Sequence, residues 1–135
     1  MLGAAIIIIG FALFQSKGLL GGPRVSISNP KNGETLKSSL DSTGVDIERG
    51  KELYGIYCAI CHGNKGDGQG NLVKREKILG IPSYDDAGRA INEGSIYHTI
   101  YYGKNAMGSY ANQLNEEERW QVVSYVLKLK ADLEK

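Results

Sequence analysis

The sequence contains few residues of the types that bind metals. Of its 135 residues, two are cysteine and two are histidine; of its two methionines, one is the first residue. With two cysteines, a four-ligand zinc site could be completed only by using both histidines. The net charge is also small. The formal net charge is +1, so the chain lacks the strong positive field that nucleic-acid binding requires. Any cofactor chemistry must come from a handful of side chains.

Both cysteines and one histidine lie together, in the run Cys58-Ala59-Ile60-Cys61-His62. The C-x-x-C-H spacing is typical of covalent haem attachment. Each sulfur can add across one vinyl group of haem, and residues three apart share a helix face, so one turn can span both vinyl groups. The next imidazole then falls beneath the iron. We interpret Cys58, Cys61 and His62 as the attachment site of one haem c, which leaves no cysteine for a disulfide.

Three other interpretations of these residues are weaker. Zinc takes four protein ligands, or three and a water, and His98 is the only further histidine. A thioredoxin-type dithiol needs a βαβ surround, whereas the flanks here indicate a helix and then a glycine loop. That loop, residues 63–70 (GNKGDGQG), lacks the G-K-[ST] ending of a phosphate-binding loop and follows a helix rather than a strand.

A second iron ligand is expected in the loop around Met107. This residue is the only methionine after Met1, and it lies next to a glycine, 45 residues after His62. Packing explains such a loop methionine poorly, so we expect it to be the second axial ligand. His98 is the alternative, but a helix-surface role explains it more simply. The carbonyl of Pro82 is expected to accept the Nδ1 proton of His62, which would fix the ring and leave Nε2 for the iron.

Helix signals lie on both sides of these residues. Asp46 can cap a helix running from 47 towards 61, and Gly50 would let another helix approach closely. Asn115 and Glu118 form a capping-box pattern at the start of the last helix. The last helix carries an apolar stripe, expected to pack on the Gly50 face of the first: Val122, Tyr125, Val126, Leu129 and Leu133.

A shorter helix is expected over residues 96–102, with Ser95 as its N-cap and Gly103 at its end. The eighteen glycines of the chain indicate loops wrapped around something rigid, and haem would supply that body. A basic cluster at Lys74, Arg75 and Lys77 is either a docking patch for a redox partner or simply a solvated loop.

The start of the chain differs in composition from the rest. Residues 2–14 are all apolar or glycine, which gives about 20 Å of helix against a hydrocarbon core of roughly 30 Å. We interpret residues 1–20 as a membrane anchor or an export-signal-like segment. Residues 21–45, rich in Gly, Ser, Asn and Pro, are expected to be an extended linker over a surface. Residues 46–135 would then form the haem domain.

Taken together, these residues resemble class I cytochromes c, from about residue 46 to residue 133. Within that family the chain is most similar to the monohaem cytochrome subunit of alternative complex III, a bacterial membrane assembly that oxidises quinol. The narrower resemblance rests on five strings: residues 66–70 (GDGQG), 82–83 (PS), 94–98 (GSIYH), 106–111 (AMGSYA) and 118–120 (ERW). Two features depart from it. Gly108 follows the methionine where relatives usually have proline, and no lipoprotein cysteine is seen near the N-terminus.

The resemblance implies an all-α cytochrome c fold around one covalent haem, preceded by an apolar segment. It implies one-electron transfer rather than enzyme activity, by a haem ligated by His62 and Met107. The partners would be subunits of a membrane respiratory complex, such as a multihaem cytochrome, and a terminal oxidase or mobile carrier. The haem domain would lie on the periplasmic face of the bacterial inner membrane. Two alternatives stay open: an independent anchored or soluble periplasmic carrier, and a haem sensor or enzyme with an open iron site.

Overall fold

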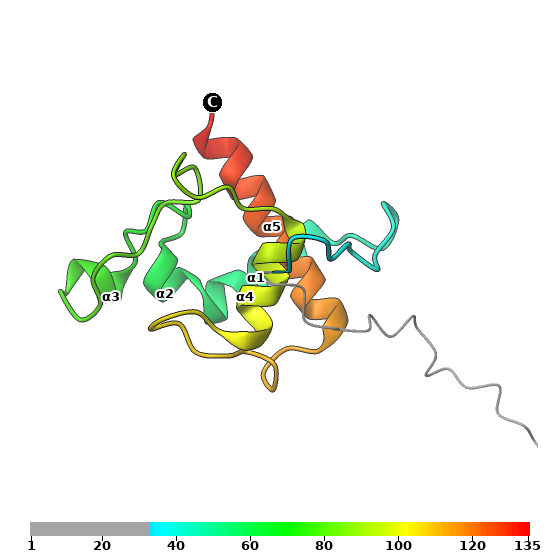
Figure 1. Cartoon of the computed structure of the whole chain (residues 1–135), viewed down its shortest axis with the longest axis horizontal. Coiled ribbons are helices and arrows are strands. Elements are labelled where there is room, and N and C mark those ends of the chain that lie inside the picture. Colours follow the sequence, from blue (N-terminus) through cyan, green and yellow to red (C-terminus); the bar gives the residue numbers. More distant parts are fainter. Residues whose placement is uncertain (1–32) are drawn as a thin grey trace, which may run out of the picture.

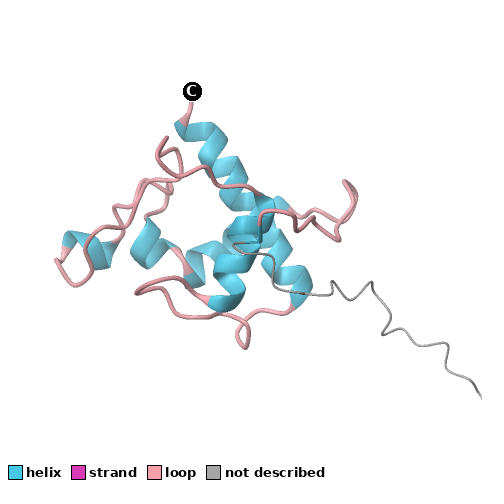
Figure 2. Cartoon of the chain, viewed as in Figure 1, coloured by secondary structure: helices cyan, strands magenta, loops and turns pink. Residues whose placement is uncertain are grey.

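The computed structural model describes residues 33–135, which contain helices and loops and no strand (Figures 1 and 2). The all-α prediction is confirmed for this part of the chain. Its helices are α1 (Ile47–Tyr57), α2 (Ala59–His62), α3 (Asn71–Lys74), α4 (Glu93–Tyr102) and α5 (Glu116–Leu133). The expected anchor at residues 1–20 lies outside the described residues. Within residues 33–135, no helix has the length and hydropathy needed to cross a bilayer.

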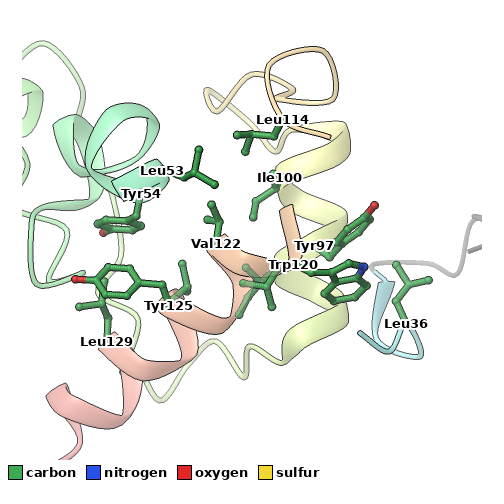
Figure 3. Close-up of a cluster of buried hydrophobic side chains, with 13 residues drawn as sticks. Leu36, Leu53, Tyr54, Tyr97, Ile100, Leu114, Trp120, Val122, Tyr125 and Leu129 are labelled. Atoms are coloured by element: carbon green, nitrogen blue, oxygen red, sulfur yellow. The ribbon is translucent and has the colours of Figure 1, made fainter. Parts of the chain in front are cut away.

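The first and last helices cross at a glycine. A Cβ atom on Gly50 would lie 2.3 Å from the carbonyl oxygen of Gln121 and 3.1 Å from Cβ of Tyr125, so only glycine permits this approach. Beside the crossing, the rings of Tyr54 and Tyr125 meet edge to face, with centroids 5.3 Å apart (Figure 3). The predicted packing of the last helix on the Gly50 face of the first is confirmed.

The hydrophobic core lies where α1 and α4 both pack on α5 (Figure 3). Trp120 of α5 is fully buried, and its ring stacks on that of Tyr97 of α4 with a centroid distance of 4.2 Å. The other buried apolar residues are Leu36, Leu53, Tyr54, Ile96, Ile100, Leu114, Val122, Val123, Tyr125, Val126 and Leu129. This core fixes α5 relative to the two helices beside it.

Two of the predicted helix starts are confirmed. The Asp46 side chain accepts a hydrogen bond from the Arg49 N–H at 2.9 Å and caps α1. At α5, the Asn115 side chain accepts from the Glu118 N–H, and the Glu118 carboxylate accepts from the Asn115 N–H. This is the reciprocal capping box expected from the sequence.

The start of α4 differs from the prediction. The helix begins at Glu93, three residues before the expected position, and its N-cap is Asn92 rather than Ser95. Ser95 is the third helical residue. Its N–H donates to the Asn92 side chain, and its hydroxyl accepts from the Asn92 N–H, both at 2.9 Å. The reason is that a serine can serve at either end of a capping box, and the asparagine three residues earlier is the better cap.

Several of residues 33–45, expected to be part of a linker, contact α4 and α5. Leu36 is only 7% exposed and belongs to the core. Gly33 touches the start of α4, where a Cβ atom on Gly94 would lie 2.0 Å from the Gly33 oxygen. Near α5, the Gln121 side chain donates to the Gly44 carbonyl at 2.8 Å. Contacts with α4 and α5 therefore extend ahead of residue 46, back to residue 33.

Candidate haem site

A large cavity lies beside the core. Its volume is about 670 Å³, within the range of sites that hold small molecules and far above the voids of an ordinary protein interior. Cys58, His62, Pro82 and Met107, four of the five predicted site residues, line it. The wall is otherwise largely apolar and includes Ile81, Tyr84, Ile91, Ile96, Ile100, Val122 and Val126. The fifth predicted residue, Cys61, is a half-buried free thiol outside this lining.

The C-x-x-C-H run forms the single helical turn that its spacing predicts. The first helix ends at Tyr57, earlier than the expected 61, because Cys58 breaks its regularity with φ −116°. The chain still winds on: the Cys58 N–H donates to the Tyr54 carbonyl at 2.8 Å, and the His62 N–H donates to the Cys58 carbonyl at 2.9 Å. The two thiols and the imidazole are therefore carried on one short, continuous turn.

His62 is held by burial and stacking. Its ring lies nearly parallel to that of Tyr84, with centroids 5.2 Å apart and an interplanar angle of 21°. Burial lowers the pKa of His62, so the imidazole is neutral, which is the form that binds a metal. Nδ1 of His62 is buried without a hydrogen-bond partner. The expected bond to the Pro82 carbonyl is therefore not formed; Pro82 contributes to the cavity wall only.

Cys58 is poorly suited to act as a thiolate. Burial, and secondarily the neighbouring Cys61, raises the pKa of its thiol to about 12. Redox-active cysteines need the opposite shift, because the thiolate is their reactive form. Within residues 33–135, no three His, Cys, Asp or Glu side chains are grouped so as to hold a metal ion. These observations disfavour the dithiol and zinc interpretations.

The glycine loop after His62 supports the cavity wall. A Cβ atom on Gly66 would lie 2.3 Å from the Tyr84 ring, and one on Gly68 would lie 2.3 Å from the Ile81 carbonyl oxygen. Both glycines have positive φ, near 77° and 74°. The Tyr84 N–H also donates to the Gly66 carbonyl at 3.0 Å. The glycines therefore hold the segment that brings Pro82 and Tyr84 to the cavity.

Met107 reaches the cavity from a tight turn. Lys104 and Met107 exchange two backbone hydrogen bonds of 2.9 Å each, and Asn105 between them has a left-handed φ of 54°. The half-buried Met107 side chain lines the same cavity as His62. His98 does not: its ring packs on Tyr102, with centroids 4.6 Å apart. Of the two candidates for a second ligand, the structure brings only Met107 to the cavity.

Three cavity residues were missed by the sequence reasoning. Tyr84 stacks on His62, and two basic residues, Arg89 and Lys104, belong to the lining. Arg89 lies 3.8 Å from the Asp86 carboxylate and is about half exposed. Its only signal in the sequence is that no other lysine or arginine occurs between residues 78 and 103. Arg89 lies in the long loop between α3 and α4, and the path of such a loop cannot be predicted from local sequence.

Comparison with known proteins agrees with the resemblance to cytochromes c that the sequence motifs indicate. A family model described as cytochrome c oxidase, cbb3-type, subunit III, matches residues 45–126. The chain belongs to this family of class I cytochromes c. It is 33% identical over 82 residues to cytochrome c6 of Synechococcus elongatus, which covers 61% of this chain and 88% of that protein. It is also 33% identical over 94 residues to chloroplastic cytochrome c6 of Chlamydomonas reinhardtii, covering 67% of this chain and 60% of that protein.

One solved structure is similar to this chain over part of its length. A chain of the Kuenenia stuttgartiensis reducing HAO-like protein complex aligns with a TM-score of 0.53 and 31% identity. The alignment covers 67% of this chain but only 44% of that one. As a cytochrome c, the protein is an electron carrier and not an enzyme, and one covalent haem c is its cofactor. The cavity fits this group: it is largely apolar, it is bordered by a thiol and a neutral imidazole, and the second thiol lies on the same turn.

Proposed function

We propose that Cys58 and Cys61 bind the haem covalently and that His62 and Met107 are its axial ligands. One observation carries this proposal: a single cavity is lined by Cys58, by the neutral imidazole of His62 and by the thioether of Met107. When bound, the haem supplies an iron that cycles between Fe(III) and Fe(II) in one-electron steps. With both axial positions taken, the open-site alternative of a sensor or enzyme is disfavoured.

The protein side chains set the properties of the site. The largely apolar wall excludes water, and the neutral thioether of Met107 favours Fe(II), so the potential should exceed that of a bis-histidine haem. Tyr84 fixes the plane of the His62 ring by stacking. Arg89 and Lys104, the two basic side chains of the lining, are suited to the two carboxylates of haem.

Replacement of Met107 by alanine tests the axial assignment. The far-red absorption band that sulfur ligation gives ferric haem should disappear. The potential should fall by on the order of 0.1 V, within the ~0.8 V span that axial ligands control. His98→Ala is the matched control, because His98 is the rival ligand and lies outside the cavity lining. A band that survives Met107→Ala, or that is lost in His98→Ala, would refute the assignment.

We further propose that the domain works as a subunit of a membrane respiratory complex that oxidises quinol, as the resemblance to the alternative complex III subunit implies. Residues 1–20 would anchor it, and the linker predicted at residues 21–45 would connect the anchor to the haem domain at the periplasmic face. The apolar run at residues 2–14 supports this arrangement. The electron acceptor would be a terminal oxidase or a mobile carrier.

An independent carrier is the second candidate, since the relatives named cytochrome c6 align over most of the domain. Purification of the full chain from native membranes distinguishes the two. A fixed subunit should stay with other membrane subunits through detergent extraction and gel filtration. An independent carrier should elute as a single haem protein, either free of detergent or in its own micelle.

A further inference from the structure

Arg119 is buried in α5 without an ion-pair partner. Its residue is 7% exposed, and within residues 33–135 no carboxylate forms a salt bridge with it. A buried guanidinium is costly unless its donors are satisfied. Here the acceptors are neutral oxygens of other segments, so the charge serves to bind parts of the chain together.

The guanidinium of Arg119 joins three segments. Its Nε donates to the Tyr97 hydroxyl of α4 at 3.1 Å. Its Nη1 donates to the Ala111 carbonyl at 3.3 Å and to the Leu114 carbonyl. The guanidinium carbon also lies over two rings of α4, 5.3 Å from the Tyr97 centroid and 5.0 Å from that of Tyr101. One side chain of α5 therefore fixes α4 and residues 111–114 together.

These contacts enclose the loop that carries Met107. The loop leaves α4 after Tyr102 and returns to α5 through residues 111–114. Arg119 therefore contacts α4 before the loop and residues 111–114 after it. Figure 3 shows Tyr97 on α4 and Leu114 at the return end. Inside the loop, the Tyr110 N–H donates to the Ile100 carbonyl at 2.9 Å, and the Tyr110 hydroxyl donates to the Tyr57 carbonyl at 3.2 Å.

We propose that Arg119 is a positioning residue that holds the Met107 loop against the haem and so determines how readily the sulfur leaves the iron. The inference rests on the proposed ligation by Met107. An arginine that only stabilised the fold would change the free energy of unfolding alone. A loop clamp also changes the fraction of folded molecules in which Met107 is displaced.

Competition by imidazole measures that fraction. Imidazole binds ferric iron only when Met107 has left, so its apparent affinity rises with the population of the open loop. Arg119→Met removes the hydrogen bonds but keeps an apolar chain. Because hydrogen bonds donated by a charged group are stronger than neutral ones, we expect imidazole to bind at least about tenfold more tightly. The titration is followed at the far-red band, at a temperature where circular dichroism shows the variant folded.

Two further variants keep the test decisive if Arg119→Met folds poorly. Tyr97→Phe removes only the hydroxyl that accepts from Nε, and it should shift imidazole affinity in the same direction by a smaller factor. Arg119→Lys keeps a cation over the tyrosine rings but lacks the forked donors, so it should restore the affinity only in part.

Arg49→Gln is the matched control. Arg49 donates to Glu118, the residue next to Arg119, at 2.8 Å, and so joins α1 to α5 away from the Met107 loop. This variant should lower the unfolding midpoint slightly and leave imidazole affinity unchanged. Equal imidazole affinity in wild type, Arg119→Met and Tyr97→Phe would overturn the clamp while leaving the ligation intact. A wild-type protein without the far-red band would overturn both proposals.

Discussion

The contact between α1 and α5 and the wall of the cavity are built in opposite ways. At the helix crossing, backbone meets backbone at Gly50 and Gln121, and Tyr54 and Tyr125 fill the space beside it. Across the cavity, α4 and α5 face loops at residues 79–91 and 103–107, and about 670 Å³ lies between them. Leu79, on these loops, is 78% exposed. Side chains of the protein fill the space at the helix crossing, whereas the space beside the cavity wall is of the kind that a haem would fill.

The size of the cavity shows how strongly the second region depends on haem. The apolar side chains of its lining bury their surface only when a group of similar size packs against them. We therefore expect the loops at residues 79–91 and 103–107 to depend on haem for their order, whereas the crossing of α1 and α5 has no such requirement of its own.

Loss of both thioether bonds should have the largest effect. In a variant with Cys58→Ser and Cys61→Ser, haem should be released by denaturing extraction. The haem-free chain should lose hydrogen-exchange protection at residues 79–91 and 103–107 while the crossing of α1 and α5 stays protected, because only the loops pack against the cofactor. Cys58→Ser alone, which leaves one thioether, is the control and should retain haem. If the haem-free chain kept native hydrogen-exchange protection at residues 79–91, the contrast between the two regions would be wrong.

Overpacking the helix crossing should have the next largest effect. Gly50→Ala forces a Cβ atom to 2.3 Å from the Gln121 carbonyl oxygen, and we expect a loss of about 3 kcal/mol in the free energy of unfolding. Gly55→Ala, on the same helix, is the matched control. No atom lies within 4 Å of its Cβ position, so it should stabilise by roughly 0.5–1 kcal/mol. Denaturant titration of both holoproteins measures the difference; equal effects would contradict the close approach.

Removing a positive charge at the cavity should act on the potential rather than on stability. Arg89→Gln removes a cation beside the haem. Loss of this positive charge favours Fe(III), so the potential of the haem should fall. A partly exposed charge contributes at most about 1 kcal/mol, or roughly 20–40 mV. Arg75→Gln is the control, because Arg75 is exposed and outside the cavity lining. Potentiometric titration at low and high salt compares them; an equal shift in both variants would point to net charge alone.

The smallest effect is expected at the residue after Met107. Nothing lies within 4 Å of a Cβ atom on Gly108, and its N–H makes no backbone hydrogen bond within residues 33–135. Gly108→Pro should therefore stiffen the loop and stabilise by about 0.5 kcal/mol, with weaker imidazole binding. Gly103→Ala, at the other end of the loop, should do the reverse, because its φ is 79° and its Cβ would lie 2.5 Å from the Met107 oxygen. Thermal denaturation and imidazole titration report both changes.

The sequence alone predicted features that depend on neighbours within a helical turn. The caps at Asp46 and Asn115 follow from side chains that reach their own backbone three residues on. The turn through Cys58 and His62 follows from residue spacing in the same way. The helix crossing at Gly50 was also predictable, because a glycine on an apolar face indicates close approach without specifying how the chain reaches it.

Only the tertiary structure decided contacts between segments far apart in the chain. It placed Leu36 in the core, stacked Tyr84 on His62 in place of the expected Pro82 hydrogen bond, and enclosed the Met107 loop with Arg119. These arrangements depend on where long loops return, and many returns satisfy the same local preferences. Packing against α5 and around the cavity selects one of them, and that selection is a property of the whole fold rather than of any short run of residues.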